Sequence, residues 1–366
     1  MSRTSREVLL VGSVPLPSAS AVFETVSKHL GSLVSRIPDG EQIGWSSAVM
    51  RTVARHEAFE ISRQVPLNAG GKDPINIFKL KHGHSMQELE PGPYGYAANA
   101  AASYSAFKQL QEQGVVPAGT RYQVTLPGPG TSTFFIELPA DVLLPLARQA
   151  LRQEIEEIVR TIPGKDLAIQ LDIAMEAEHE EYLRRPQDFD QPLHTVFHWS
   201  LAQMAESVAW LANTIPEEVE LGFHICSIWH HDPSAGQDNA VLVDIANAIL
   251  QRVARRVDYV HIPVIPEHSR VDMEPFGRLQ RKPETKLFLG LINVVDGVEG
   301  ARRRIADAEQ YVSDFGVGSY CGLGRPATAT SRAPTAHSAP PIPALRRATA
   351  ETIGSVLDLH RSVAEL

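Results

Sequence analysis

The sequence contains only two cysteines, Cys226 and Cys321, among 366 residues. Two cysteines cannot build the disulfide framework of a small secreted domain, although one disulfide between them remains possible. The sequence also lacks a surplus of positive charge, because 34 Lys and Arg stand against 43 Asp and Glu, for a formal net charge of -9. That balance argues against non-specific binding to nucleic acid, which depends on cations that displace the counterions of phosphates.

Long apolar runs are missing as well. No stretch approaches the roughly 20 apolar residues that span a membrane, and the polar start at residues 1–6 is not followed by the apolar core of a signal peptide. We therefore expect a cytoplasmic protein that binds neither membrane nor nucleic acid. The composition is otherwise that of a globular protein, with 43% hydrophobic and 21% charged residues.

Eight short apolar runs are spread along the sequence, and a polar or Gly/Pro-rich turn follows each one. They cover 7–11, 33–36, 121–126, 167–171, 219–226, 257–262, 287–291 and 315–320, with helical patterns such as 140–161, 201–213, 239–255 and 300–311 between them. This alternation predicts an α/β fold, a single (β/α)8 TIM barrel over residues 1–366. An open doubly wound sheet is the alternative.

Two segments depart from the alternation. About eighty residues separate the second and third runs and predict an elaborated connection between these strands. Residues 326–343 are rich in Ala, Pro, Ser and Thr, which is typical of a flexible loop. The apolar spacing over 344–364 then predicts a helix that closes the barrel.

The fifth run ends in His224-Ile225-Cys226, and Cys321 directly follows the eighth. Side chains alternate along a strand, so His224 and Cys226 point the same way. The carboxyl ends of all strands meet at one face of a barrel, which places Cys321 at that face too. Two thiolates and one imidazole, completed by an oxygen, are typical ligands of tetrahedral Zn²⁺. The alternative is that the cysteines are small buried side chains and His224 is a hydrogen-bonded core residue.

Other polar side chains follow the strands at the same face, and we assign them provisional roles. Glu267 is the expected fourth zinc ligand, with His261, His230 and His231 as competitors. Asp172 is expected to hold a cationic or hydroxyl group of the substrate with help from Ser13, unless it only caps the following helix. Glu41 is the expected general acid, ahead of Asp39, His82 and His84. Further candidate substrate-binding residues are Asp39, Thr131 and Asn293.

Several of these segments together resemble the catalytic C-terminal barrel of the cobalamin-independent methionine synthase family, within the uroporphyrinogen decarboxylase and methionine synthase-like superfamily. Val11-Gly12-Ser13-Val14-Pro15 is similar to the Ile-Gly-Ser-Phe-Pro of that family, and His224-Ile225-Cys226 to its zinc-binding His-x-Cys. The other matching segments, in order, are Gly-Pro-Gly-Thr at 128–131, Gln-Leu-Asp at 170–172, the segment 267–274 and Cys-Gly-Leu at 321–323.

The resemblance implies a zinc-dependent methyl or alkyl transferase whose small-molecule thiol becomes a thiolate nucleophile and attacks an alkyl donor. Two departures favour substrates other than homocysteine and methyl-folate. Ile173-Ala174 stands where the family has Glu-Pro, and the aromatic residue that follows the family's Gly-Pro-x-Thr is represented in this sequence only by Phe134 and Phe135, with no Trp. A lyase of the uroporphyrinogen decarboxylase type and a non-catalytic zinc-binding barrel remain as alternatives.

Overall fold

The computed structural model describes residues 5–44, 47–65, 75–85, 92–184, 186, 199–226, 239–264, 272–324 and 348–366. Its centre is one sheet of eight parallel strands in the order β1-β10-β9-β8-β7-β6-β5-β2. The strands are β1 (Val8–Leu9), β2 (Arg36–Pro38), β5 (Arg121–Pro127), β6 (Leu167–Ile173), β7 (Glu220–Ile225), β8 (Tyr259–Pro263), β9 (Lys286–Ile292) and β10 (Phe315–Ser319). A parallel bridge between Ser13 and Gly40, beyond β1 and β2, joins the two edges. The predicted TIM barrel is therefore confirmed.

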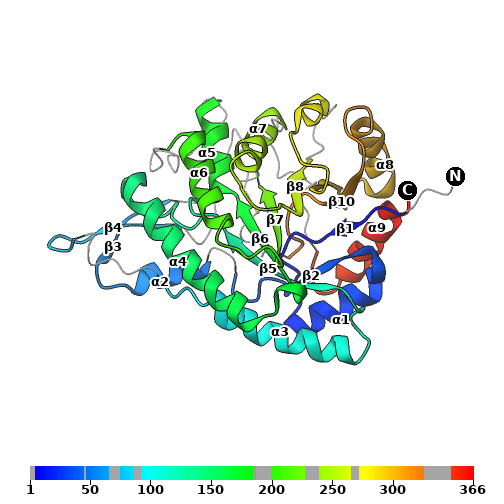
Figure 1. Cartoon of the computed structure of the whole chain (residues 1–366), viewed down its shortest axis with the longest axis horizontal. Coiled ribbons are helices and arrows are strands. Elements are labelled where there is room, and N and C mark those ends of the chain that lie inside the picture. The colour runs from blue at the N-terminus through cyan, green and yellow to red at the C-terminus, as the bar shows by residue number, and fades with distance from the viewer. Residues whose placement is uncertain are drawn as a thin grey trace.

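Helices surround the sheet on its outer side (Figure 1). They are α1 (Ala19–Leu30), α3 (Tyr96–Glu112), α4 (Ala140–Thr161), α5 (Met175–Arg184), α6 (Leu201–Ala212), α7 (Asn239–Leu250), α8 (Gly297–Ala308) and α9 (Ile353–Ala364). Both faces of the sheet are covered, which explains why the strands read as continuous apolar runs. All seven residues of β6, for example, are buried. In the described part of the chain, no helix is both long enough and apolar enough to cross a membrane.

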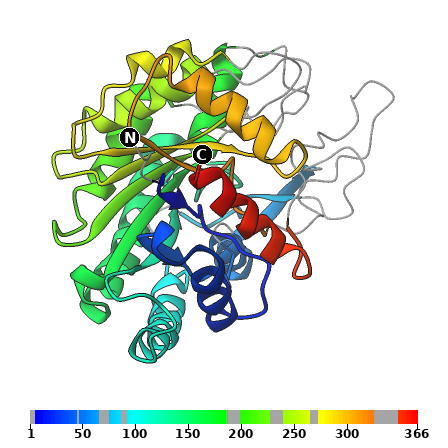
Figure 2. The same ribbon diagram turned by 90° about the vertical axis from the view of Figure 1, so that its right-hand side faces the viewer.

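The C-terminal helix α9 completes the outer layer. It packs against α1, α8 and β1, so the last helix lies beside the first described strand and helix (Figure 2). The backbone N–H of Arg6 donates to the carbonyl of Ala364 over 2.7 Å. The helix predicted over 344–364 is present from Ile353, whereas the loop predicted at 326–343 lies outside the described residues.

The connection between the second and third barrel strands is elaborated, as predicted, and it contains a β-hairpin that the sequence analysis did not predict. It holds α2 (Ser47–Arg55), an antiparallel hairpin of β3 (Phe59–Val65) and β4 (Ile75–Leu80), and then α3. The hairpin extends to one side of the barrel (Figure 1). A backbone hydrogen bond from Phe78 to the carbonyl of Phe135 ties it to the loop after β5.

The second strand was predicted at 33–36 and this was wrong, because residues 31–33 form a 3-10 helix and the strand begins at Arg36. Arg36 is 6% exposed and lies inside the barrel, where its guanidinium pairs with Glu220 at 2.9 Å and with Glu7 at 3.3 Å. It also lies over the ring of Tyr259, 4.5 Å from the centroid. A charged residue can occupy this interior position because two carboxylates and an aromatic face surround it.

Candidate functional site

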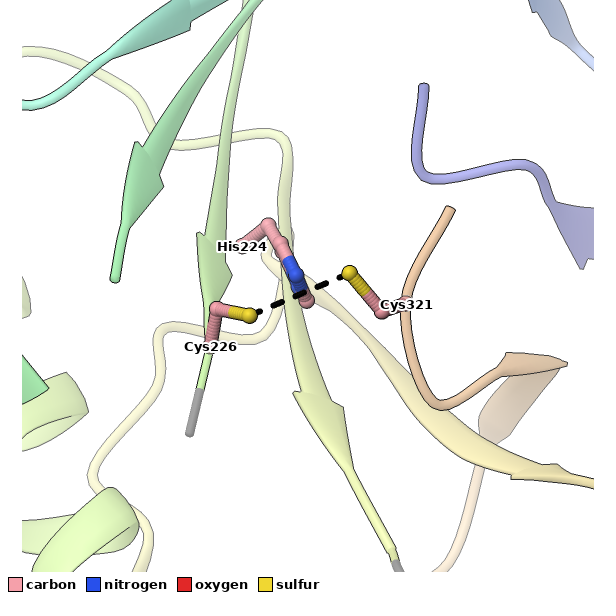
Figure 3. A group of neighbouring side chains, drawn as sticks. All are labelled: His224, Cys226 and Cys321. Atoms are coloured by element: carbon pink, nitrogen blue, oxygen red, sulfur yellow. Dashed lines mark hydrogen bonds between the residues drawn. The ribbon is translucent and has the colours of Figure 1, made fainter. Parts of the chain in front are cut away.

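The structure brings His224, Cys226 and Cys321 together (Figure 3). His224 lies near the end of β7, Cys226 follows that strand, and Cys321 follows β10. All three side chains are buried, and one potential ligand atom from each lies within 4.8 Å of the others. The three residues form a group that could hold a metal ion.

The two sulfur atoms are 3.8 Å apart. A disulfide has an S–S length of about 2.05 Å, so the cysteines are free thiols and the possible disulfide is not present. Two thiolates that bind a tetrahedral zinc ion at about 2.3 Å each stand about 3.8 Å apart. The observed separation fits a shared zinc ion without movement of either strand.

His261, one of the competing ligands, lies beside His224. Asp172 on β6, His224 on β7 and His261 on β8 are aligned in register, so their side chains share one level of the barrel. The Nδ1 atoms of the two histidines are 2.8 Å apart, and Nε2 of His261 lies 3.0 Å from the carbonyl oxygen of Ser319. Burial holds the pKa of His261 well below its usual value. Both ring nitrogens of His261 are engaged by protein groups. His261 is therefore a neighbour of the group formed by His224, Cys226 and Cys321, which we call the metal group, and is not a member of it.

Asp172 lies at the same level as His224 and is 2% exposed. The side-chain amide of Gln170 donates to Asp172 Oδ1 over 2.9 Å, and the Gln170 amide also donates to the carbonyl of Val11. The backbone carbonyl of Asp172 accepts from Gly128. These bonds hold the carboxylate in place next to His224.

Ser13 contacts the loop that carries Cys321. Its carbonyl accepts from the N–H of Leu323 over 2.7 Å, and its hydroxyl accepts from the N–H of Gly324. A Cβ on Gly322 would lie only 2.1 Å from Ser13 Oγ, so this position requires glycine. The turn after β1 therefore packs directly against the residues that follow Cys321.

Glu41 lies above the end of β1 in a left-handed backbone conformation, with φ of 57°. A non-glycine residue in this region is uncommon and often belongs to a functional site. A Cβ on Gly12 would lie 2.2 Å from Glu41 Oε1, so the glycine leaves the space that the carboxylate fills. Glu41 lines a small pocket with Tyr96, Asn99 and Thr125 among its other walls.

Asp39 organises the same loop. Its Oδ1 accepts from the backbone N–H of Glu41 over 2.9 Å. Its Oδ2 accepts from the Asn99 amide at 2.7 Å, the Ser103 hydroxyl at 2.9 Å and the Tyr122 hydroxyl at 3.1 Å. Four protein donors thus surround Asp39, which makes it a residue that positions Glu41.

Thr131 and Asn293 also shape loops. The Thr131 hydroxyl accepts from the N–H groups of Ala174 and Met175 and donates to Glu176 at 2.5 Å, which leaves it no free donor or acceptor for a substrate. Burial raises the pKa of Glu176. Asn293 Oδ1 accepts from the N–H of Val295, and the residue lines a small pocket together with Cys321.

The remaining candidates lie elsewhere. Glu267, His230 and His231 are outside the described residues. His82 and His84 occupy the turn after β4, next to the end of the hairpin where Phe59 pairs with Leu80, and His82 is exposed. Among the described residues, Glu41 is a carboxylate whose side chain adjoins the turn after β1.

Sequence reasoning missed the residues that support the site. Asn99, Ser103 and Tyr122 surround Asp39, although they come from α3 and β5. No local pattern marks them, because each is a common polar residue on a regular element. The link from His261 to His224 had a weak signal in the sequence, since the two histidines lie on consecutive strands.

The comparisons with known proteins agree with this fold. No protein-family model matches the sequence, and no curated protein matches it. Among solved structures, a B12-independent methionine synthase from Shewanella sp. W3-18-1, in complex with selenomethionine, aligns with a TM-score of 0.56 at 14% identity over 99% of this chain and 97% of that chain. A proposed vitamin-B12 independent methionine synthase from Listeria monocytogenes aligns with a TM-score of 0.52 at 14% identity, over 94% of this chain and 86% of that chain. This chain is thus similar in fold, over nearly its whole length, to B12-independent methionine synthases.

Proposed function

We propose that this protein is a zinc-dependent transferase that moves a methyl or alkyl group onto a small-molecule thiol. The observation that carries the proposal is the buried group of His224, Cys226 and Cys321, with a sulfur separation of 3.8 Å that suits tetrahedral zinc. The similarity in fold to B12-independent methionine synthases supports the same class of reaction.

The donor set suits zinc better than a hard cation, because thiolate and imidazole prefer a borderline-soft metal. His224, Cys226 and Cys321 would hold the ion, and we propose Glu267 as the fourth ligand. Nε2 of His224 is buried and has no hydrogen-bond partner among the described residues, as expected for an atom that donates its lone pair to a metal. A bound zinc ion would lower the pKa of a substrate thiol and hold its sulfur in place.

Asp172 would anchor the thiol substrate. Its carboxylate lies in register with His224, so a cationic or hydroxyl group on the substrate can bind there while the sulfur faces the metal group. Ser13, which contacts the loop after Cys321, would assist from the opposite edge of the sheet. This arrangement holds the reacting sulfur in one orientation, which lowers the entropic part of the barrier.

Glu41 would act as the general acid. In the transfer, the substrate sulfur forms a bond to the alkyl carbon, the bond from that carbon to its leaving atom breaks, and Glu41 supplies the proton that the leaving atom takes up. Its carboxylate contacts Gly12, and the next residue, Ser13, contacts the loop of Cys321. Glu41 therefore lies on the same face of the barrel as the metal group.

The experiment combines metal analysis with a screen of substrates. Purified protein is analysed for zinc and then mixed with homocysteine, coenzyme M or glutathione in the presence of methyl-folate or an epoxide, and loss of free thiol is followed. We expect about one zinc per chain and turnover with at least one pair. Cys321→Ser should lose both zinc and turnover, whereas Glu41→Gln, the matched control, should keep zinc and lose turnover.

Zinc content that is unchanged in Cys321→Ser would contradict the metal site. Zinc binding without any thiol loss, across every donor tried, would favour a non-catalytic zinc-binding barrel over a transferase.

A further inference from the structure

Three buried groups form a continuous chain of hydrogen bonds next to the metal group. Ser319 on β10 offers its carbonyl oxygen to His261 Nε2 at 3.0 Å, and His261 Nδ1 lies 2.8 Å from His224 Nδ1. His261 is 0% exposed and His224 is 1% exposed. These side chains are closed to solvent, so a ring N–H on either histidine needs an acceptor within the protein.

The chain permits one consistent assignment of protons. A carbonyl oxygen only accepts, so His261 Nε2 must carry hydrogen. In a neutral imidazole the other nitrogen is then an acceptor, which requires His224 Nδ1 to donate. His224 Nε2 is left as a bare lone pair, and this atom is buried without a hydrogen-bond partner among the described residues.

The reverse arrangement is unfavourable. If His261 donated from both nitrogens, His224 Nδ1 would have to accept, and Nε2 of His224 would carry hydrogen. That N–H would then be buried with no acceptor among the described residues, at the full desolvation cost of an unpaired donor. A bare lone pair, by contrast, is the form of imidazole that binds a metal ion.

We propose that His261 is a positioning residue that fixes His224 in the Nδ1–H tautomer, so that His224 Nε2 is the metal-binding atom. The proposal rests on the metal site of the proposed function and adds a second residue to it. The bond to Ser319 also ties the strand of His261 to β10, whose next residues lead to Cys321. His261 therefore orients the imidazole ligand with reference to the strand that delivers the second thiolate.

Two variants separate the hydrogen bond from the mere presence of a buried side chain. His261→Asn keeps an acceptor where Nδ1 lies, and His261→Leu fills similar space without one. His179→Leu serves as the control, since it removes a buried histidine on α5 that hydrogen-bonds the carbonyl of Trp199. Metal affinity is measured by titration of the metal-free protein with Co²⁺ and by competition for Zn²⁺ with a chelator.

We expect His261→Leu to bind both metals 10–100-fold more weakly, the usual effect of removing such a partner from a histidine ligand. His261→Asn and the His179→Leu control should remain within a few-fold of wild type. Equal metal affinity of wild type and His261→Leu would overturn the proposal and leave the proposed function intact.

A second measurement does not depend on metal or on the folding of a variant. Long-range ¹H–¹⁵N correlation spectra of the metal-free wild-type protein, labelled with ¹⁵N at histidine, report the tautomer of each ring. We expect Nδ1–H for His224 and Nε2–H for His261. The opposite tautomer of His224, or a doubly protonated ring, would overturn the proposal. If wild type bound no metal, the proposed function would fail, whereas these spectra would still decide whether His261 sets the tautomer.

Discussion

Replacing Asp39 with Asn tests how the loop of Glu41 is held. The carboxylate accepts four hydrogen bonds, one from the backbone of Glu41 and three from Asn99, Ser103 and Tyr122. An amide has one oxygen, so at least one of these donors must face an NH₂ group. Hydrogen bonds to a charged group contribute about 1.5–3 kcal/mol, and an unpaired buried donor costs about 1–3 kcal/mol. We expect Asp39→Asn to lower the free energy of unfolding by about 2–4 kcal/mol.

Urea denaturation followed by circular dichroism measures this change, and an unchanged m-value would show that the unfolding transition is the same. Ser103→Ala is the matched control, because it removes one donor to Oδ2 and leaves the bond to Glu41 intact. It should cost about 1.5 kcal/mol, the low end of the range for one hydrogen bond to a charged group. If Asp39→Asn were as stable as wild type, or lost no more than Ser103→Ala, the carboxylate would not be the group that organises this loop.

Two further predictions concern the interior and the mouth of the barrel. Arg36→Met should lower the free energy of unfolding by about 1.5–3 kcal/mol, the contribution of hydrogen bonds to a charged group, because Glu7 keeps Lys286 and Glu220 keeps Arg121 as a second cation. Thermal unfolding checks this. Burial alone would raise the pKa of Glu7, but Arg36, Lys286 and a hydrogen bond from Ser35 together outweigh it and hold that pKa below its usual value of 4.5. The stability from this pair is therefore present above pH 4.5 and lost as the pH falls, and the acid-induced loss should shrink in Arg36→Met. Gly322→Ala should push Ser13 away from the loop of Cys321. We expect zinc binding to weaken about tenfold, which is the size of effect seen when a residue that supports a metal ligand is lost. A chelator titration in which the variant matches wild type would contradict this.

Much of the barrel follows from local patterns. Strands buried on both faces are continuous apolar runs, and helices between them have an apolar stripe, so their alternation is visible in the sequence. The positions of His224, Cys226 and Cys321 follow as well, because residues after parallel strands must meet at one face. These inferences depend on neighbours along the chain.

The parts that could not be predicted depend on distant residues. The start of β2 at Arg36 is stabilised by ion pairs with Glu7 and Glu220. The local sequence at 33–36 does not show that these distant residues become its partners. The roles of Asp39 and Thr131 likewise follow from donors that fold against them. A hydroxyl or carboxylate after a strand can face a substrate or the protein, and only the surrounding structure decides between these.

The most direct test of the zinc site is X-ray absorption at the zinc edge of the loaded wild-type protein. We expect two sulfur ligands at about 2.3 Å, from Cys226 and Cys321, and nitrogen or oxygen ligands at about 2.0–2.2 Å, one of them from His224. A spectrum with no sulfur around zinc, or a protein that takes up no zinc under reducing conditions, would contradict the site.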